Sequence, residues 1–225
     1  MLFDLRSRGR RRTVQAVYLG LALLMGGGLV LFGVGAGNGF GGILNAFTGN
    51  GSGNNQKQVV SAQETQALRQ TQANPNDPTG WANLLQARWT NAGQGSNYDT
   101  ATGTFTAAGK KELAGAVQAW QRYRALVKSP DPNLTILAAR ANAALGDWGA
   151  AANAWEDETL VSPTESKAYE CLAVTSYAAG QARKGDLATA KALSLLPKAQ
   201  QPAIKQSLQQ AQKSPSAAQQ LAQQC

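Results

Sequence analysis

A spacing of 34 residues, shared by two kinds of residue, constrains the fold of this chain most strongly. Gly146 and Gly180 are 34 positions apart, and so are Pro163 and Pro197. Glycine suits a turn between helices because it adopts a positive φ at little cost. Proline ends a helix because it lacks the backbone N–H and restricts the residue before it. A turn and a stop that recur together predict stacked helix–turn–helix units, so we expect an all-α fold.

The best-formed unit covers about residues 133–163. Small apolar residues fill its first half, while a glycine turn, a small residue and two tryptophans mark its second half. The marked positions are Leu137, Ala138, Ala139, Ala141, Leu145, Gly146, Trp148, Ala151, Trp155 and Pro163. The last six resemble the consensus of the tetratricopeptide (TPR) family, whose repeat is 34 residues long. The bulky residue that this family has early in the first helix is absent. The resemblance implies paired helices that bind peptides or proteins in a concave groove.

The following unit, residues 166–197, is eroded in its second half. Its start matches the family at Tyr169, Leu172 and Ala173. However, Ala182 and Thr189 stand where the better unit has Trp148 and Trp155. A weakened terminal repeat is typical of such arrays because its outer side faces water.

The preceding unit is split by an insertion at residues 92–109. The helical positions on its two sides are Trp81, Leu84, Leu85, Ala116, Trp120 and Tyr123. The array therefore has about three repeats, and we expect Trp81, Trp120, Trp148 and Trp155 in its core.

The insertion supplies most of our candidates for partner contact. It is rich in Gly, Thr, Asn and Ser, and Tyr98 and Phe105 are its bulky apolar residues. Insertions in repeat proteins form loops on one face, which is often the binding face. The alternative is an ordinary surface loop. Arg88 and Trp89, at the end of the preceding helix, complete the candidate set.

The first residues predict a membrane anchor. Residues 1–12 hold five arginines and one acid, and residues 13–36 read as a transmembrane helix without a charge from Val14 to Gly35. About 20 apolar residues cross a bilayer, and the arginine-rich side stays in the cytoplasm. Everything after the span would then lie outside the cytoplasmic membrane. The alternative is a signal peptide that is cleaved near Ala36.

Glycines in and beside the span could pack against another membrane helix, although glycine is also common in membrane helices generally. These candidates are Gly26, Gly27, Gly28, Gly33 and Gly37.

Residues 37–57 read as a flexible Gly/Asn/Ser-rich linker, and residues 58–214 as the helical domain. Within it, Ala203, Ile204, Leu208 and Ala211 form a weak helical stripe. In residues 215–225 we expect fraying, because little besides Leu221 is available for burial.

The N-terminal sequence Met1-Leu2-Phe3-Asp4-Leu5-Arg6 and the glycine-rich span resemble membrane-anchored repeat proteins of actinobacteria. The overall plan, one anchor and an exported TPR domain, is similar to the translocon-associated YfgM family in architecture. These resemblances imply a protein-binding scaffold or chaperone-like helper outside the membrane. The alternative that we keep is a structural accessory subunit of a membrane protein complex.

The net charge of +8 does not point to nucleic acid. Residues 1–12 contribute +4, which leaves +4 over the exported part. That mild excess does not favour a polyanion such as DNA. Six basic residues lie from Arg183 onward against one acid, Asp186. They indicate either ordinary solvated helix faces or a contact with anionic lipid or an acidic partner.

The chain has two cysteines, Cys171 and Cys225. An exported domain permits a disulfide between them. It would close a loop of about 55 residues and stabilise the fold by roughly 4 kcal/mol. The alternative is one buried thiol and one free terminal thiol.

Residues for catalysis and cofactor binding are scarce. The chain has no histidine, so Ser/His and Cys/His nucleophile pairs are excluded. Two distant cysteines do not make a zinc site by themselves, and no glycine-rich phosphate loop is present. We interpret Glu156, Asp157 and Glu158 as a solvated helix face rather than a catalytic pair. The sequence therefore predicts no enzyme, no cofactor and no metal.

Overall fold

The computed structural model describes the backbone of residues 53–225 and the side chains from Ala62 onward. The predicted cytoplasmic segment, the span, the five candidate glycines in and beside it, and most of the linker lie outside the described residues. Within residues 53–225, no helix is both long enough and apolar enough to cross a membrane.

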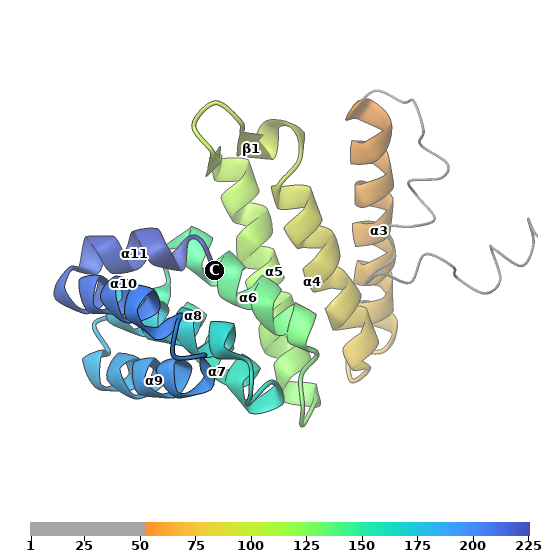
Figure 1. The fold of residues 1–225 in the computed structure, drawn as a ribbon. Coiled ribbons are helices and arrows are strands. Elements are labelled where there is room, and N and C mark those ends of the chain that lie inside the picture. Colours follow the sequence, from red (N-terminus) through yellow and green to blue (C-terminus); the bar gives the residue numbers. More distant parts are fainter. Residues whose placement is uncertain (1–52) are drawn as a thin grey trace, which may run out of the picture. The chain divides into compact units, whose positions relative to one another are not determined.

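Apart from one small hairpin, the described part of the chain is built from helices (Figure 1). The elements are α3 (Gly53–Ala73), α4 (Pro78–Ala92), the short 3-10 helix η1 (Gly95–Asn97), β1 (Tyr98–Asp99), β2 (Thr104–Phe105), α5 (Ala107–Leu126), α6 (Pro132–Leu145), α7 (Trp148–Val161), α8 (Ser166–Ala178), α9 (Ala182–Leu195), α10 (Gln201–Lys213) and α11 (Pro215–Ala222). The prediction of an all-α fold is confirmed for these residues.

Consecutive helices pack in pairs. The most extensive contacts join α4 to α5, α6 to α7, and α8 to α9. Contacts of α5 with α6 and of α7 with α8 link one pair to the next, and α10 and α11 both pack on α8. The chain therefore forms successive helical hairpins whose last pair is covered by two further helices (Figure 1).

Aspartates at helix starts set where several of these helices begin. The carboxylates of Asp77, Asp131 and Asp147 accept backbone N–H groups in the first turns of α4, α6 and α7. They satisfy donors that have no partner inside the helix. Pro78 and Pro132 follow at the first helical position, where the missing N–H costs nothing.

The two glycines that predicted turns have the same geometry. Gly146 has φ 81° and Gly180 has φ 73°, values that favour glycine. In each turn the glycine N–H bonds to the carbonyl three residues back, and the next N–H bonds to the carbonyl five residues back. This pattern is the C-terminal cap known as the Schellman motif. The same backbone hydrogen bonds thus recur 34 residues apart.

A second feature recurs near the helix starts. The Trp81 indole N–H donates to the Pro75 carbonyl at 2.8 Å, and the Tyr169 hydroxyl donates to the Pro163 carbonyl at 3.4 Å. Both bonds span six residues. Each one ties the first turn of a helix to the connection before it.

The core contains two of the four tryptophans that we expected there. Trp120 and Trp155 are buried, whereas Trp81 and Trp148 are half-buried and pack against the core from its edge. The smaller side chains of the core are largely alanines, which lets paired helices approach closely.

Tyr177 fills the core of the α8–α9 pair, which lacks a tryptophan. Its hydroxyl donates to Asp186 at 2.8 Å and lies 3.1 Å from the Thr189 hydroxyl. Burial raises the pKa of Tyr177 to about 12, so the donor proton stays in place. Gly185 leaves room for the ring, because a Cβ there would collide with it. In this pair α9 has no tryptophan, and Tyr177 of α8 supplies the large aromatic side chain of the core.

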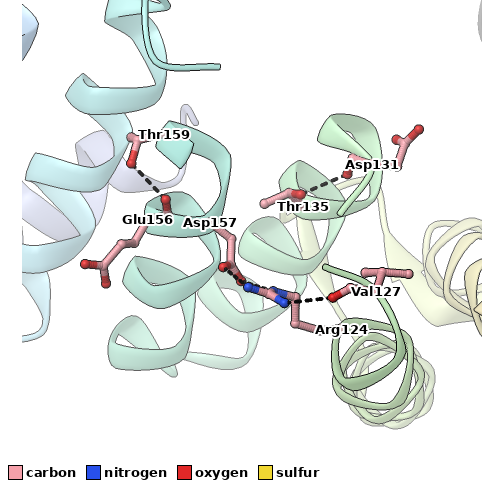
Figure 2. A network of polar contacts seen from close by, with 7 residues as sticks. All are labelled: Arg124, Val127, Asp131, Thr135, Glu156, Asp157 and Thr159. Carbon is pink, nitrogen blue, oxygen red and sulfur yellow. Dashed lines mark hydrogen bonds and ion pairs between the residues drawn. The ribbon is translucent and has the colours of Figure 1, made fainter. Parts of the chain in front are cut away.

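The acidic cluster is not the solvated face that the sequence predicted. Asp157 binds Arg124 of α5 through two hydrogen bonds of 3.0 and 2.9 Å (Figure 2), and Glu156 binds Lys184 of α9 at 2.7 Å. Glu158 is buried. Successive helix positions are about 100° apart, because a turn takes 3.6 residues. Three adjacent acids therefore point in three directions, and two of them link α7 to its neighbours.

Glu158 is the least satisfied of these acids. Its side chain is only 4% exposed. One carboxylate oxygen accepts the Ser162 hydroxyl at 2.9 Å, and the other has no partner in the described part of the chain. Burial raises the pKa of Glu158; the bond from Ser162 offsets part of this effect, and Asp131 and Glu165 add to it.

We expect Glu158→Gln to stabilise the fold at a pH above the folded-state pKa of Glu158, where the carboxyl would be ionised, and not in acid. A raised folded-state pKa means that the folded chain binds the proton more tightly, so stability falls as pH rises from the unfolded pKa through the folded one. Removing the charge should raise the free energy of unfolding by about 1 kcal/mol at pH 8 and change it little at pH 4. Urea unfolding at both pH values measures this. Glu156→Gln, at an exposed ion pair, is the control and should change stability by under about 0.5 kcal/mol. Equal effects of Glu158→Gln at both pH values would contradict the prediction.

The predicted linker ends earlier than expected, because α3 begins at Gly53, inside the 37–57 range. The sequence between Gly53 and Pro75 has no further Gly or Pro to interrupt a helix. Ala67 and Thr71 are buried, and Gln70 accepts a hydrogen bond from Asn83 of α4 at 3.0 Å. Tertiary contacts with α4 thus help to hold this polar segment as a helix.

The C-terminal residues form a helix rather than a frayed tail. The Ser214 hydroxyl accepts the Ala217 N–H and caps α11, which starts at Pro215. Ala218, Ala222 and Cys225 belong to the buried core, and half-buried Leu221 packs against it. The spacing of i, i+3 and i+4 places Ala218, Leu221 and Ala222 on one face of α11, and Cys225 follows the end of the helix. The prediction missed this face because it counted alanines as offering nothing to bury. In α10 the predicted stripe holds for Ile204, Leu208 and Ala211, which pack in the core, while Ala203 is exposed.

Candidate partner-binding surface

Three of the four predicted contact residues meet at one end of the α4–α5 pair. Trp89 lies near the end of α4, Tyr98 on β1 and Phe105 on β2. The Tyr98 and Phe105 ring centroids are 5.1 Å apart in an edge-to-face arrangement, and those of Trp89 and Phe105 are 6.4 Å apart. All three side chains are half-buried, so each offers part of its ring to solvent.

The insertion is an ordered hairpin rather than an irregular loop. Tyr98 pairs with Phe105 in the antiparallel register of β1 and β2. The Asp99 carboxylate accepts the Ala101 N–H at 2.9 Å and so shapes the turn. Thr106 donates its N–H to the Asn97 carbonyl at 2.9 Å and caps α5 with its hydroxyl. These bonds fix the two aromatic rings in place before any partner arrives.

Apolar residues continue this surface onto α5 and α6. Beneath the aromatic rings lie the buried residues Ala92, Leu113 and Ala141, and half-buried Val117 and Leu145 pack beside them. We call Trp89, Tyr98, Phe105, Val117 and Leu145 the aromatic surface. Rigid aromatic side chains that are partly exposed are the residue types that dominate protein–protein binding energy.

Arg88, the fourth candidate, is separated from this surface. Its guanidinium lies over Gly115 of α5, where any side chain would collide with it. Its Nε forms an ion pair with the Glu64 carboxylate of α3 at 3.2 Å, and this Nε has no hydrogen-bond partner among the described residues. Asn91 donates to the same carboxylate at 3.2 Å. Burial, and then the charge of Glu64, raise the pKa of nearby Glu112, while Arg88 partly offsets the effect. Arg88 therefore stabilises contacts between α3, α4 and α5.

A shallow hollow of about 480 Å³ lies between α3, α4 and α5. Its lining includes Trp81, Arg122 and Leu126, and Leu126 is 38% exposed. Arg122 is the one charged residue among the residues that line it. Sequence reasoning did not indicate this hollow, because its wall depends on α3.

Groups for metal binding are lacking in the part of the chain that the structure describes. No cluster of three or more His, Cys, Asp or Glu side chains there is arranged to hold a metal ion.

Cys171 and Cys225 form a disulfide in the structure, with Cα atoms 5.7 Å apart. Cys171 lies on α8, and Cys225 follows α11. The Arg140 side chain of α6 donates to the Cys225 carbonyl at 2.8 Å. The chain end is thus attached to both α6 and α8, the first helices of two successive pairs.

No protein-family model, no curated protein and no solved structure matches this chain.

Proposed function

We propose that this chain is a membrane-anchored, TPR-like scaffold or chaperone-like helper that binds protein segments outside the cytoplasmic membrane. The observation that carries the proposal is the aromatic surface. It presents rigid, partly exposed rings on a hairpin fixed by its own hydrogen bonds. Such a surface suits short apolar segments of other proteins, because little side-chain entropy is lost on contact.

Two features support the TPR-like array of about three repeats. The helical hairpins follow one another with contacts between neighbours, and the turns at Gly146 and Gly180 share their φ values and hydrogen bonds at the family's period. The uncharged run at residues 13–36, with arginines before it, supports the anchor. The disulfide is in keeping with an oxidising compartment outside the cytoplasm.

The alternative is an accessory subunit with one fixed partner complex. The glycines of the span and the aromatic surface would then each contact that complex permanently. Affinity purification in mild detergent separates the two functions. Many substoichiometric partners favour the helper, and one stoichiometric membrane complex favours the subunit. Deleting residues 1–36 tests the same distinction. An accessory subunit that binds its complex through the span should no longer bind it, whereas a helper should still bind peptides.

We expect Tyr98→Ser with Phe105→Ser to weaken partner binding about tenfold or more, since truncating central aromatic contacts costs over 1 kcal/mol each. The measurement is the dissociation constant of a partner peptide identified by crosslinking. The control is Leu160→Ser, which removes a residue of α7 that is 71% exposed and distant in sequence from the hairpin. Equal losses in both variants, with unchanged thermal unfolding, would contradict the assignment of this surface.

A further inference from the structure

Charge is divided unevenly between the two halves of the helical domain. Residues 58–165 carry eight basic and ten acidic side chains, which gives −2. Residues 166–225 carry seven basic and two acidic side chains, which gives +5. A field of this kind attracts an anionic surface to the C-terminal half.

The exposed side of α9 combines this charge with an apolar residue. Arg183, Leu187 and Lys191 are all exposed, and Leu187 is 66% exposed. Their spacing of four residues places them along one helix face. We call these three residues, with Lys198 just beyond the helix, the basic surface.

Few acids compete for these cations. Arg183 and Lys198 form no ion pair within the described residues, whereas neighbouring Lys184 binds Glu156 of α7. Asp186, the one acid in residues 171–225, accepts hydrogen bonds from Tyr177 and Gln212. It is therefore turned toward α8 and α10. The Lys191 ammonium group lies over the Tyr169 ring, 5.9 Å from its centroid, and forms no ion pair with a carboxylate of the described residues.

We propose that the basic surface docks on the headgroups of an anionic lipid bilayer, with Leu187 entering the boundary between headgroups and acyl chains. This face carries the two kinds of side chain by which proteins bind at a membrane interface: cations that contact anionic headgroups, and an apolar residue, Leu187, one turn from a cation on each side. The membrane anchor of the proposed function would hold this surface at a high local concentration of lipid headgroups, which favours lipid over an acidic protein. The inference rests on the membrane anchor of the proposed function, which keeps the domain near a bilayer.

The test uses the full chain in lipid nanodiscs, with an environment-sensitive fluorophore attached at Ala190→Cys, beside Leu187. We expect about a twofold rise in fluorescence in anionic discs over neutral discs, reversed by high salt. Lipids with brominated acyl chains should quench it. Arg183→Glu with Lys191→Glu should abolish the response. Lys110→Glu with Lys111→Glu changes the net charge equally, at exposed sites on α5, and should preserve it.

Three results would overturn the inference. The first is equal fluorescence in neutral and anionic discs, and the second is equal loss in both charge variants. The third is a response to added polyglutamate together with no quenching by brominated lipid, which would assign the surface to an acidic protein. A chain that enters neither kind of disc would refute the anchor instead. In that case, anionic vesicles are added to the same labelled chain and its fluorescence is measured. No change in fluorescence would show that the basic surface does not bind anionic lipid.

Discussion

Replacing Cys225 by serine is expected to lower the free energy of unfolding by about 4 kcal/mol. The disulfide closes a loop with a sequence separation of 54 residues, and a closed loop of that size restricts the unfolded chain by about this amount. Domains of this size are stable by only about 5–15 kcal/mol, so much of the stability would be lost. Urea unfolding of the full chain in detergent, followed by tryptophan fluorescence, measures the change.

Position 225 is the better site for this substitution. Cys171 is fully buried, so replacing it would add the cost of a cavity or of a buried hydroxyl. The unsubstituted chain, unfolded with and without a reductant, is the matched control and should show the same difference. Hydrogen exchange should also become faster across α11, because eight residues do not form a stable helix alone. A change under 1 kcal/mol, with α11 still protected, would show that non-covalent contacts suffice to hold the tail.

Trp155→Ala is expected to cost about 3–5 kcal/mol, because it removes a large buried side chain and leaves a cavity. Trp155 is 4% exposed and belongs to the cluster that joins the central helices. Many residues of that cluster are alanines, such as Ala138, Ala139 and Ala152, and their short side chains cannot refill the space. Urea unfolding measures the loss.

Trp148→Ala provides the comparison. Trp148 is half-buried at the edge of the same cluster, so its removal should cost less than half as much. The two tryptophans lie on the same helix and differ mainly in burial. Equal costs would contradict the view that burial decides the contribution of each one.

The turns and helix starts were predictable because they depend on residues close in sequence. A glycine with positive φ, an aspartate at a helix start and a proline in a first turn act through hydrogen bonds that span a few residues. The hairpin between Gly93 and Thr106 was harder to predict. It is held by hydrogen bonds such as that from the Thr106 N–H to the Asn97 carbonyl, and this bond can form only when the turn between the two residues has formed.

Side-chain partners were predicted less well. Nothing in the sequence distinguishes the three adjacent acids of α7. In the structure, Glu156 contacts α9 and Asp157 contacts α5, whereas Glu158 is buried. Arg88 and Trp89 are adjacent, yet one faces α3 and α5 and the other joins the aromatic surface. Helix rotation separates such neighbours, and only the position of the surrounding helices decides what each one meets.

By itself, the sequence determined the helical class, the positions of the turns at Gly146 and Gly180, and the short apolar stripe of α10. These features follow from backbone preferences of single residues and from the spacing of apolar residues within one helix, both of which depend on residues close together in the sequence. The tertiary structure alone decided the burial of Glu158, the contacts of Arg88, the meeting of Trp89 with the hairpin aromatics and the helical form of α11. Those outcomes depend on contacts between residues far apart in the chain, whose distances are fixed only when all the helices have packed.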